Sequence, residues 1–322
     1  MRLDDEVVRG MELGKAHKHF ASPMNSLSFH RTRDLLVAAT DDDALYVYDI
    51  ESGEPARSQP VFCRKYGAQC VTWTHSADAE GSHAVRYLSL DTNQYYVYFE
   101  GHAGRVTGLD MSPKNDTFLS AGMDRTVRLW DLRTPVCQAV LTTPAPPVAA
   151  FDQQGLVFAV GTSGGVIRLY DAAQYVKGPF ETFVVPELRN RSTCFSQLLF
   201  SNDGETLVAA AGGTAYVLDA FNGAVRHALR LGAPEAAAPP QVSLSYDGAY
   251  LISGCDATGA VGVWSTASGS QVAAWRGAAA DAPPRCCAWA PRRLMAASGT
   301  IMLSLWAPGP SARERALAAA AP

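Results

Sequence analysis

Short runs of alternating hydrophobic and polar residues, separated by turn residues, organise this sequence. The clearest example lies in residues 101–131, where three such runs follow one another: Val106–Pro113, Thr117–Asp124 and Thr126–Asp131. A period of two places successive side chains on opposite faces of a β-strand. The segment therefore predicts strand, turn, strand, turn, strand.

The third run of this unit recurs along the chain as an apolar, variable, apolar, aromatic pattern that often ends in Asp. Its copies lie at residues 45–49, 85–89, 127–131, 167–171, 215–219, 261–265 and 302–306. The equivalent positions Tyr48 and Trp306 are six repeats apart, which is 43 residues per repeat. That period is typical of WD repeats, each of which forms one blade of a β-propeller.

The unit that begins at Gly101-His102 and ends at Trp130-Asp131 resembles a complete WD repeat. Seven copies predict an all-β fold, a seven-bladed WD-repeat β-propeller. We expect this propeller to occupy residues 1–307, followed by an Ala-rich flexible tail over residues 308–322.

A propeller must close its ring, because an open end would expose a strand edge and apolar surface. The last repeat shows three strands, Cys286–Ala290, Leu294–Ala297 and Met302–Trp306, and no outer strand. We therefore expect residues 7–13 to close the ring as the missing strand. In the second repeat, residues 74–83 have no β-branched residue after Thr74, which predicts a short or irregular second strand.

Composition and charge exclude several functional classes of protein. The chain has 27 basic and 31 acidic residues and a net charge of −4. This balance argues against a dedicated nucleic-acid or membrane-surface binder. No apolar run reaches the length of a membrane span, and the acidic start lacks a signal region. The seven cysteines form no C-x-x-C pair, which indicates a reducing compartment.

The best-defined polar constellation consists of His102, Ser120, Asp124 and Trp130. In a WD blade these residues form a buried hydrogen-bonded chain from Asp to His, from His to Ser, and from Ser to the Trp ring nitrogen. The set resembles a Ser-His-Asp triad in composition only, and we expect a structural role. His17 and His19 lack further ligands at matching spacing. We therefore expect no catalytic residue, no cofactor and no metal site.

Two features suggest protein partners. The loops entering the first strands carry Asn25, Arg105, Arg189, Arg191 and Arg285, which we interpret as a candidate partner-binding face. Solvated rim residues are the alternative interpretation. The sequence Trp130-Asp131-Leu132-Arg133 fits a W-D-x-R pattern found in propeller receptors of cullin-type ubiquitin ligases. A ligase substrate receptor is therefore the alternative function.

Several stretches resemble one particular family. They are residues 86–90, 101–113, 127–135, 151–156, 177–180 (KGPF), 200–204 and 219–223 (DAFNG). They are similar to the WD-repeat subunit shared by the COMPASS histone lysine methyltransferase complex and the protein phosphatase 1/PNUTS transcription-termination complex. The resemblance covers roughly residues 1–306, and the Ala-rich later repeats depart from it most.

The resemblance implies a non-catalytic nuclear scaffold, monomeric within a hetero-complex. Its implied partners are a phosphatase 1 targeting scaffold, a SET-domain methyltransferase subunit and the phosphorylated C-terminal repeats of RNA polymerase II. No direct nucleic-acid or membrane contact is expected. The sequence leaves open which of the two assemblies the chain serves.

Overall fold

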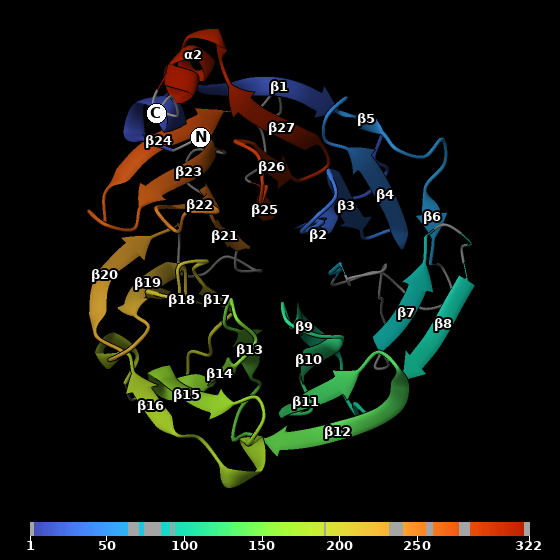
Figure 1. The fold of residues 1–322 in the computed structure, drawn as a ribbon, viewed down its shortest axis with the longest axis vertical. Coiled ribbons are helices and arrows are strands. Elements are labelled where there is room, and N and C mark those ends of the chain that lie inside the picture. Colours follow the sequence, from blue (N-terminus) through green and yellow to red (C-terminus); the bar gives the residue numbers. More distant parts are fainter. Residues whose placement is uncertain are drawn as a thin grey trace.

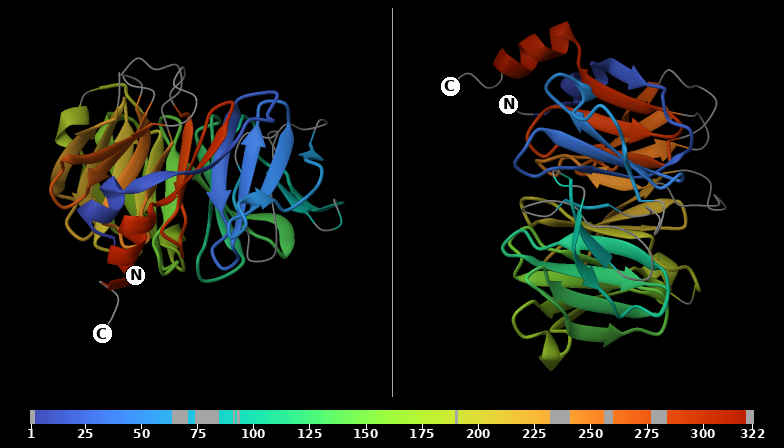
Figure 2. Two further views of the ribbon diagram at one scale, coloured as in Figure 1. Left: turned by 90° about the horizontal axis from the view of Figure 1, so that it is seen from above. Right: turned by 90° about the vertical axis from the view of Figure 1, so that its right-hand side faces the viewer.

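Antiparallel sheets stand radially around a common axis and form a ring (Figure 1). The structure is a computed structural model that describes residues 3–63, 71–73, 85–90, 92, 94–189, 191–231, 241–255, 260–276 and 284–318. The fold is an all-β WD-type propeller, as predicted. Seen edge-on, the sheets form a thick disc, with helix α2 (Pro310–Ala318) at its rim (Figure 2).

Most sheets contain four consecutive strands that pair in chain order. The first is β2 (Met24–Phe29), β3 (Leu35–Thr40), β4 (Ala44–Asp49) and β5 (Glu54–Pro55), with β6 (Val61–Phe62) also on β4. The next complete sheet is β9 (Val106–Met111), β10 (Thr117–Gly122), β11 (Thr126–Asp131) and β12 (Thr134–Thr142). It is followed by β13 (Val148–Phe151), β14 (Val157–Gly161), β15 (Val166–Asp171) and β16 (Glu181–Val184).

Two more sheets follow the same plan. They are β17 (Gln197–Phe200), β18 (Thr206–Ala211), β19 (Thr214–Asp219) and β20 (Val225–Arg230), then β21 (Val242–Leu244), β22 (Tyr250–Cys255), β23 (Ala260–Ser265) and β24 (Gln271–Arg276). The last sheet joins β25 (Cys286–Trp289), β26 (Ala296–Gly299) and β27 (Leu303–Pro308) to β1 (Met11–His17). Short 3₁₀ helices η1 (Ser163–Gly165), η2 (Tyr175–Lys177) and η3 (Pro186–Leu188) lie in connections.

The blade count differs from the expectation of seven. The described residues form six sheets of at least four strands and one two-stranded sheet, β7 (Val85–Ser89) with β8 (Gln94–Phe99). This small sheet lies between the β2–β6 and β9–β12 sheets in the ring (Figure 1). Six complete blades are therefore seen. Residues 74–83, which are predicted to contain a short or irregular second strand, lie outside the described residues.

The segment expected to add an outer strand to the last sheet was placed too early. Residues 7–10 are not in a strand, because α1 spans Asp5–Arg9, whereas residues 11–13 belong to β1, which begins at Met11 and pairs with β27. Asp4 starts the helix by accepting the backbone N–H of Val7 on its side chain (2.8 Å), and Asp5 and Glu6 lie in the first turn. Capping by Asp4 therefore places Val7 and Val8 in a helix, although β-branched residues favour strands.

In the segment 308–322, where a flexible tail is predicted, the structure describes residues up to Ala318. Pro308 belongs to β27, and α2 follows it directly. Ala312 is buried and lies against Gly10 at the end of α1, where an added Cβ would come within 2.9 Å of it. The Gly309 N–H also donates to the Gly10 carbonyl (2.9 Å). Helix α2 is therefore attached to the propeller beside α1.

The core lies between neighbouring sheets. Ala159 and Ile167 of the β13–β16 sheet, for example, share one buried cluster with Leu207 and Ala209 of the next sheet. Each middle strand is covered on both faces, so all six residues of β18 are buried. The outer strand β12 instead alternates between exposed and half-buried residues. None of the helices in the described ranges is long and apolar enough to cross a membrane.

Candidate protein-interaction surfaces

Strands β10 and β11, the turn between them and the connection before β9 bring together His102, Ser120, Asp124 and Trp130. We call this set the polar chain. Asp124 Oδ2 lies 2.9 Å from His102 Nδ1, and His102 Nε2 lies 2.7 Å from Ser120 Oγ. Trp130 Nε1 donates to the same Ser120 oxygen (2.8 Å). The four side chains thus form the predicted sequence of contacts.

The polar chain is closed to solvent at its centre. Ser120 and Trp130 are 0% exposed, and Ser120 Oγ already contacts both of its neighbours. Burial favours the neutral form of Asp124, but hydrogen bonds from Thr126, His102 and the Ala103 N–H outweigh it and hold the pKa of this carboxyl below its ordinary value. The arrangement stabilises a blade and leaves a substrate no access to Ser120.

A second, shorter version of this arrangement lies in the last sheet. Trp306 Nε1 on β27 donates to Ser298 Oγ on β26 (2.9 Å), as Trp130 does to Ser120. The sequence analysis did not select this pair. The eight-residue separation of Ser298 and Trp306, against ten in the polar chain, was the available signal.

Polar side chains on the innermost strands join successive sheets. Asp110 Oδ2 accepts the N–H of Phe151 on β13 (2.7 Å), and Ser243 Oγ accepts the N–H of Trp289 on β25 (3.0 Å). Gln197 exchanges two hydrogen bonds with the backbone of Val242. Burial raises the pKa of Asp110 to about 6. These contacts fix neighbouring blades in register.

The predicted partner-binding face is distributed around one end of the ring. Arg105, Arg189, Arg191 and Arg285 are exposed and precede the inner strands of three different sheets, and Asn25 lies in β2. Arg285 approaches Asp41 of the neighbouring sheet (3.7 Å), which joins the ends of two blades. Among the described ion pairs, this is the only one that includes a residue of the set.

Arg133 of the W-D-x-R motif binds its own chain. Its Nε and Nη2 donate to the two carboxylate oxygens of Asp131 (2.8 and 2.5 Å). This guanidinium lowers the pKa of Asp131 to about 2. The Arg133 side chain is 75% exposed. A partner that binds the Arg133 guanidinium group through paired hydrogen bonds would have to displace Asp131 from it.

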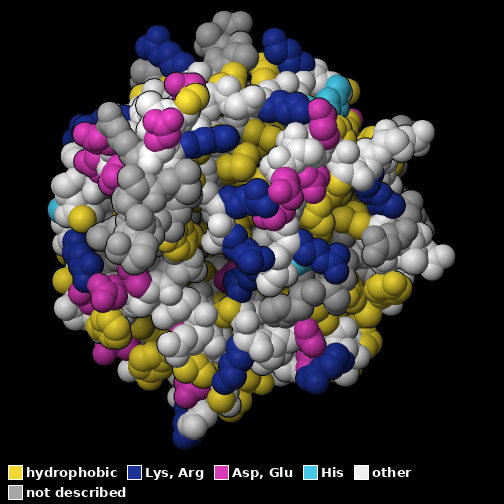
Figure 3. All heavy atoms as spheres, turned by 45° about the horizontal axis from the view of Figure 1, so that its top comes forward, with side chains coloured by type: hydrophobic (Ala, Val, Ile, Leu, Met, Phe, Trp, Pro, Cys, Tyr) yellow, Lys and Arg dark blue, Asp and Glu magenta, His cyan; other side chains and the backbone are white. Residues whose placement is uncertain are grey.

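Another arginine cluster, not selected from the sequence, joins the first and last sheets at the ends of their inner strands. Arg293 donates to both carboxylate oxygens of Asp34 (2.9 and 2.6 Å), and Arg292 donates to the Thr32 carbonyl (2.5 Å). Figure 3 shows Lys and Arg side chains interspersed with Asp and Glu on the face it presents. This mixture agrees with the balanced composition.

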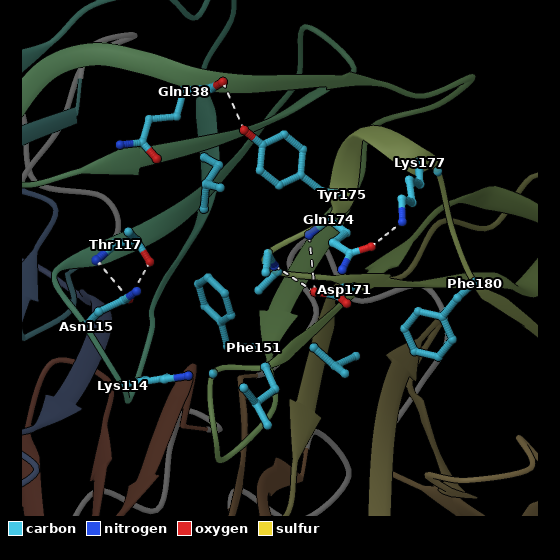
Figure 4. A pocket seen from close by; sticks show the side chains of 17 residues that line it. Lys114, Asn115, Thr117, Gln138, Phe151, Asp171, Gln174, Tyr175, Lys177 and Phe180 are labelled. Carbon is cyan, nitrogen blue, oxygen red and sulfur yellow. Dashed lines mark hydrogen bonds between the residues drawn. The ribbon is translucent and has the colours of Figure 1, made fainter.

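A pocket of about 780 Å³ opens between the β9–β12 and β13–β16 sheets (Figure 4). One wall carries Lys114 and Asn115, from the β9–β10 connection, together with Leu129 and Gln138. The other side consists of Phe151, the turn at Gly155-Leu156 and the β15–β16 connection, residues 171–180. No sequence pattern placed these segments together, because they meet only through blade packing.

No metal site is found in the described part of the chain, where no three His, Cys, Asp or Glu side chains converge. His17 contacts the Gly53 carbonyl (2.9 Å), and His19 contacts the Tyr48 hydroxyl (2.8 Å). Desolvation and the neighbouring His17 lower the pKa of His19.

Similarity to known proteins agrees with this geometry. The WD domain, G-beta repeat model matches residues 11–49 and 93–131. Protein ANTHESIS POMOTING FACTOR 1 of Arabidopsis thaliana is 37% identical over 317 residues, covering 95% of this chain and 93% of that protein. WD repeat-containing protein 82 of Drosophila melanogaster is 33% identical over 316 residues, covering 96% and 98%. The chain belongs to the WD repeat-containing protein 82 family.

This chain is also similar to COMPASS component SWD2 of Saccharomyces cerevisiae. It is 34% identical over 212 residues, which cover 62% of each protein. The family resemblance inferred from the sequence motifs is thereby confirmed.

The two matched repeats also explain how the family's sequence maps onto blades. The match over residues 11–49 begins on β1 and continues through β2, β3 and β4. The match over residues 93–131 begins at β8 and continues through β9, β10 and β11. Each sequence repeat therefore contains the outer strand of one sheet and three strands of the next.

Proposed function

We propose that the protein is a non-catalytic scaffold subunit of nuclear complexes that act on RNA polymerase II transcription. The complexes would be a COMPASS-like histone lysine methyltransferase, a phosphatase 1 termination assembly, or both. The observation that carries this proposal is the similarity along 95% of the chain to full-length members of its family. The name of the yeast relative, a COMPASS component, supports the methylation assembly.

Rigid display of loops is the proposed mechanism. The polar chain and the inner-strand contacts hold the blades at fixed positions, so the connecting loops offer several surfaces at constant spacing. The closed environment of Ser120 supports a structural rather than a catalytic role.

We also infer a ring of seven blades closed by β1. Strands β7 and β8 would be the third and outer strands of the second blade in chain order, because they lie between the β2–β6 and β9–β12 sheets in the ring (Figure 1). Trp73, twelve residues before β7, donates its Nε1 hydrogen to the Ser28 carbonyl of the first sheet (2.8 Å). The antiparallel pairing of β1 with β27 supports closure.

The face carrying Asn25, Arg105, Arg189, Arg191 and Arg285 is the proposed site for phosphorylated C-terminal repeats of RNA polymerase II. Exposed guanidinium groups bind phosphate through paired hydrogen bonds. Combined Arg105→Glu and Arg285→Glu changes should weaken binding of a phosphoserine repeat peptide at least tenfold, measured by fluorescence anisotropy. Equal affinity of both proteins for the peptide would remove this face from the proposal.

Affinity purification of the tagged full chain from nuclear extract, with mass spectrometry, tests the function. Recovery of a SET-domain methyltransferase supports the methylation assembly, and recovery of phosphatase 1 with its targeting scaffold supports termination. Recovery of neither, with a cullin adaptor that is lost on Arg133→Ala, would favour the ubiquitin-ligase alternative instead. A matched tagged propeller from another family controls for non-specific capture.

A further inference from the structure

The pocket between the β9–β12 and β13–β16 sheets has a positive rim. Lys114 and Lys177 lie on opposite sides of it (Figure 4). Neither lysine forms an ion pair within the described residues, and Lys177 Nζ donates to the neutral side chain of Gln174. The single acidic lining residue, Asp171, accepts the N–H groups of Ala173 and Gln174 in its own turn (2.7 and 3.2 Å).

The interior of the pocket is apolar and partly open to water. Leu129 and Phe151 are 7% and 6% exposed, whereas Leu156 and Phe180 remain 47% and 59% exposed. Covering such side chains with an apolar group removes apolar surface from water and thereby stabilises a complex. Apolar surface between two lysines suits an occupant with a large apolar side chain and nearby negative charge.

Two glycines give the pocket its shape. Gly178 has φ +90° and ψ −176°, a conformation that is essentially restricted to glycine. It turns the chain after η2, so that Phe180, just before β16, donates its N–H to the Leu169 carbonyl (2.9 Å) and lines the pocket. Gly155, at φ +65°, brings the β13–β14 turn so near that an added Cβ would lie 2.7 Å from Ser112 Oγ.

These positions account for the KGPF segment, residues 177–180, which the propeller itself does not require. Lys177 supplies charge, Gly178 supplies the turn, and Phe180 supplies apolar surface at the same pocket. No feature of β-sheet pairing needs an exposed phenylalanine here. The segment therefore serves the pocket.

We propose that this pocket binds a short extended segment of a partner protein that carries a large apolar side chain flanked by acidic residues. The apolar side chain enters between Leu156 and Phe180, and the carboxylates bind Lys114 and Lys177. The inference rests on the proposed scaffold function and names one of its binding sites. The volume of about 780 Å³ accommodates a few side chains.

A library of random 12-residue peptides, selected on the full chain, tests the proposal and requires no assumption about the sequence of the partner. We expect enriched peptides to combine Phe, Trp or Leu with Asp or Glu. The best synthetic peptide should bind at least tenfold more weakly to Phe180→Ala and to the Lys114→Glu/Lys177→Glu double variant. Phe221→Ala and Lys18→Glu, which change exposed residues outside the pocket, should leave the affinity unchanged.

Several results would overturn the inference. They are a selection that enriches no such peptides, equal affinity across all four variants, or loss of binding in the controls as well. Concentration-dependent self-association abolished by Phe180→Ala, measured by sedimentation, would assign the pocket to a second copy of the chain. Melting temperatures of all variants should match, because each altered side chain is solvent-accessible.

The same variants separate this inference from the proposed function. If the unaltered chain recovers no transcription or chromatin complex from nuclear extract, the proposed function fails. If it recovers one, and Phe180→Ala recovers it equally while no peptide selects the pocket, only the pocket inference fails.

Discussion

The β9–β12 blade and the blade made from β25, β26, β27 and β1 contain the same four-stranded sheet but hold it together differently. In the first, all strands come from residues 106–142, and the polar chain crosses the blade. In the second, Met11 pairs with Pro308, and only the Ser298–Trp306 bond corresponds to the polar chain.

Apolar packing replaces the missing polar contacts in the second blade. Trp275 lies against both Trp289 and Trp306, with ring centroids 5.8 and 5.6 Å apart. Helix α1 adds fully buried Val7 and Val8 to the same cluster. A sheet whose strands are local in sequence can be fixed by directional hydrogen bonds. A sheet that joins distant segments here depends on burial, which is less directional.

Among the changes that test the difference between the two blades, deletion of residues 3–17 should reduce stability most. The deletion removes β1 and α1, which exposes the edge of β27 and the apolar cluster around Trp306. We expect little soluble protein and loss of the cooperative thermal transition by circular dichroism. The matched control, deletion of residues 310–322, removes α2 and should lower the melting temperature by only a few degrees. An unchanged melting temperature after the larger deletion would show that β1 is dispensable.

Replacing the buried serine of each blade by alanine should lower the free energy of unfolding by an intermediate amount, which differs between the two blades. Ser120→Ala leaves two buried partners, His102 and Trp130, without their serine contact, whereas Ser298→Ala affects Trp306. We expect losses of about 3 and about 1.5 kcal/mol in unfolding free energy, measured by urea denaturation. Asp124→Ala combined with Ser120→Ala should cost less than the sum of the two single changes. Equal losses at Ser120 and Ser298 would contradict the distinction between the blades.

The smallest effect is a difference in pH dependence between Asp110 and Ser243, which make corresponding contacts to the next sheet. Burial raises the pKa of Asp110 to about 6, so its protonated form favours the folded state. This contribution is complete below the unfolded pKa of about 4 and is lost as the pH rises through 6. Asp110→Asn should therefore flatten the stability profile between pH 4 and 7, whereas Ser243→Ala should keep the slope. Parallel profiles for the unaltered chain and Asp110→Asn would refute this assignment.

The repeating part of the fold was predictable from sequence. The predicted third strands coincide with β4, β11, β15, β19 and β23, because alternation and turn residues act within a few positions. The polar chain was predictable for the same reason, since its residues occupy fixed places in a repeat. The strand expected over residues 7–13 was placed too early, because Asp4 caps helix α1 and β1 begins only at Met11.

Contacts between blades were not predictable, because they join residues that no local pattern relates. The Arg293–Asp34 pair and the pocket at Phe180 depend on how neighbouring sheets pack. The sequence contains Phe180 two residues after Gly178, but the role proposed for Phe180 depends on the position of Lys114 in the preceding blade. The arginine face remains a prediction.

The pairing of β1 with β27 also determines the order of events during synthesis. The strand that contains Met11 leaves the ribosome long before Pro308 exists, whereas β9 to β12 emerge together and can pair at once. The nascent chain must therefore carry an unpaired edge and the apolar residues of α1 through nearly the whole of translation. The last sheet can assemble only after residues 303–308 have been synthesised, so the ring closes late.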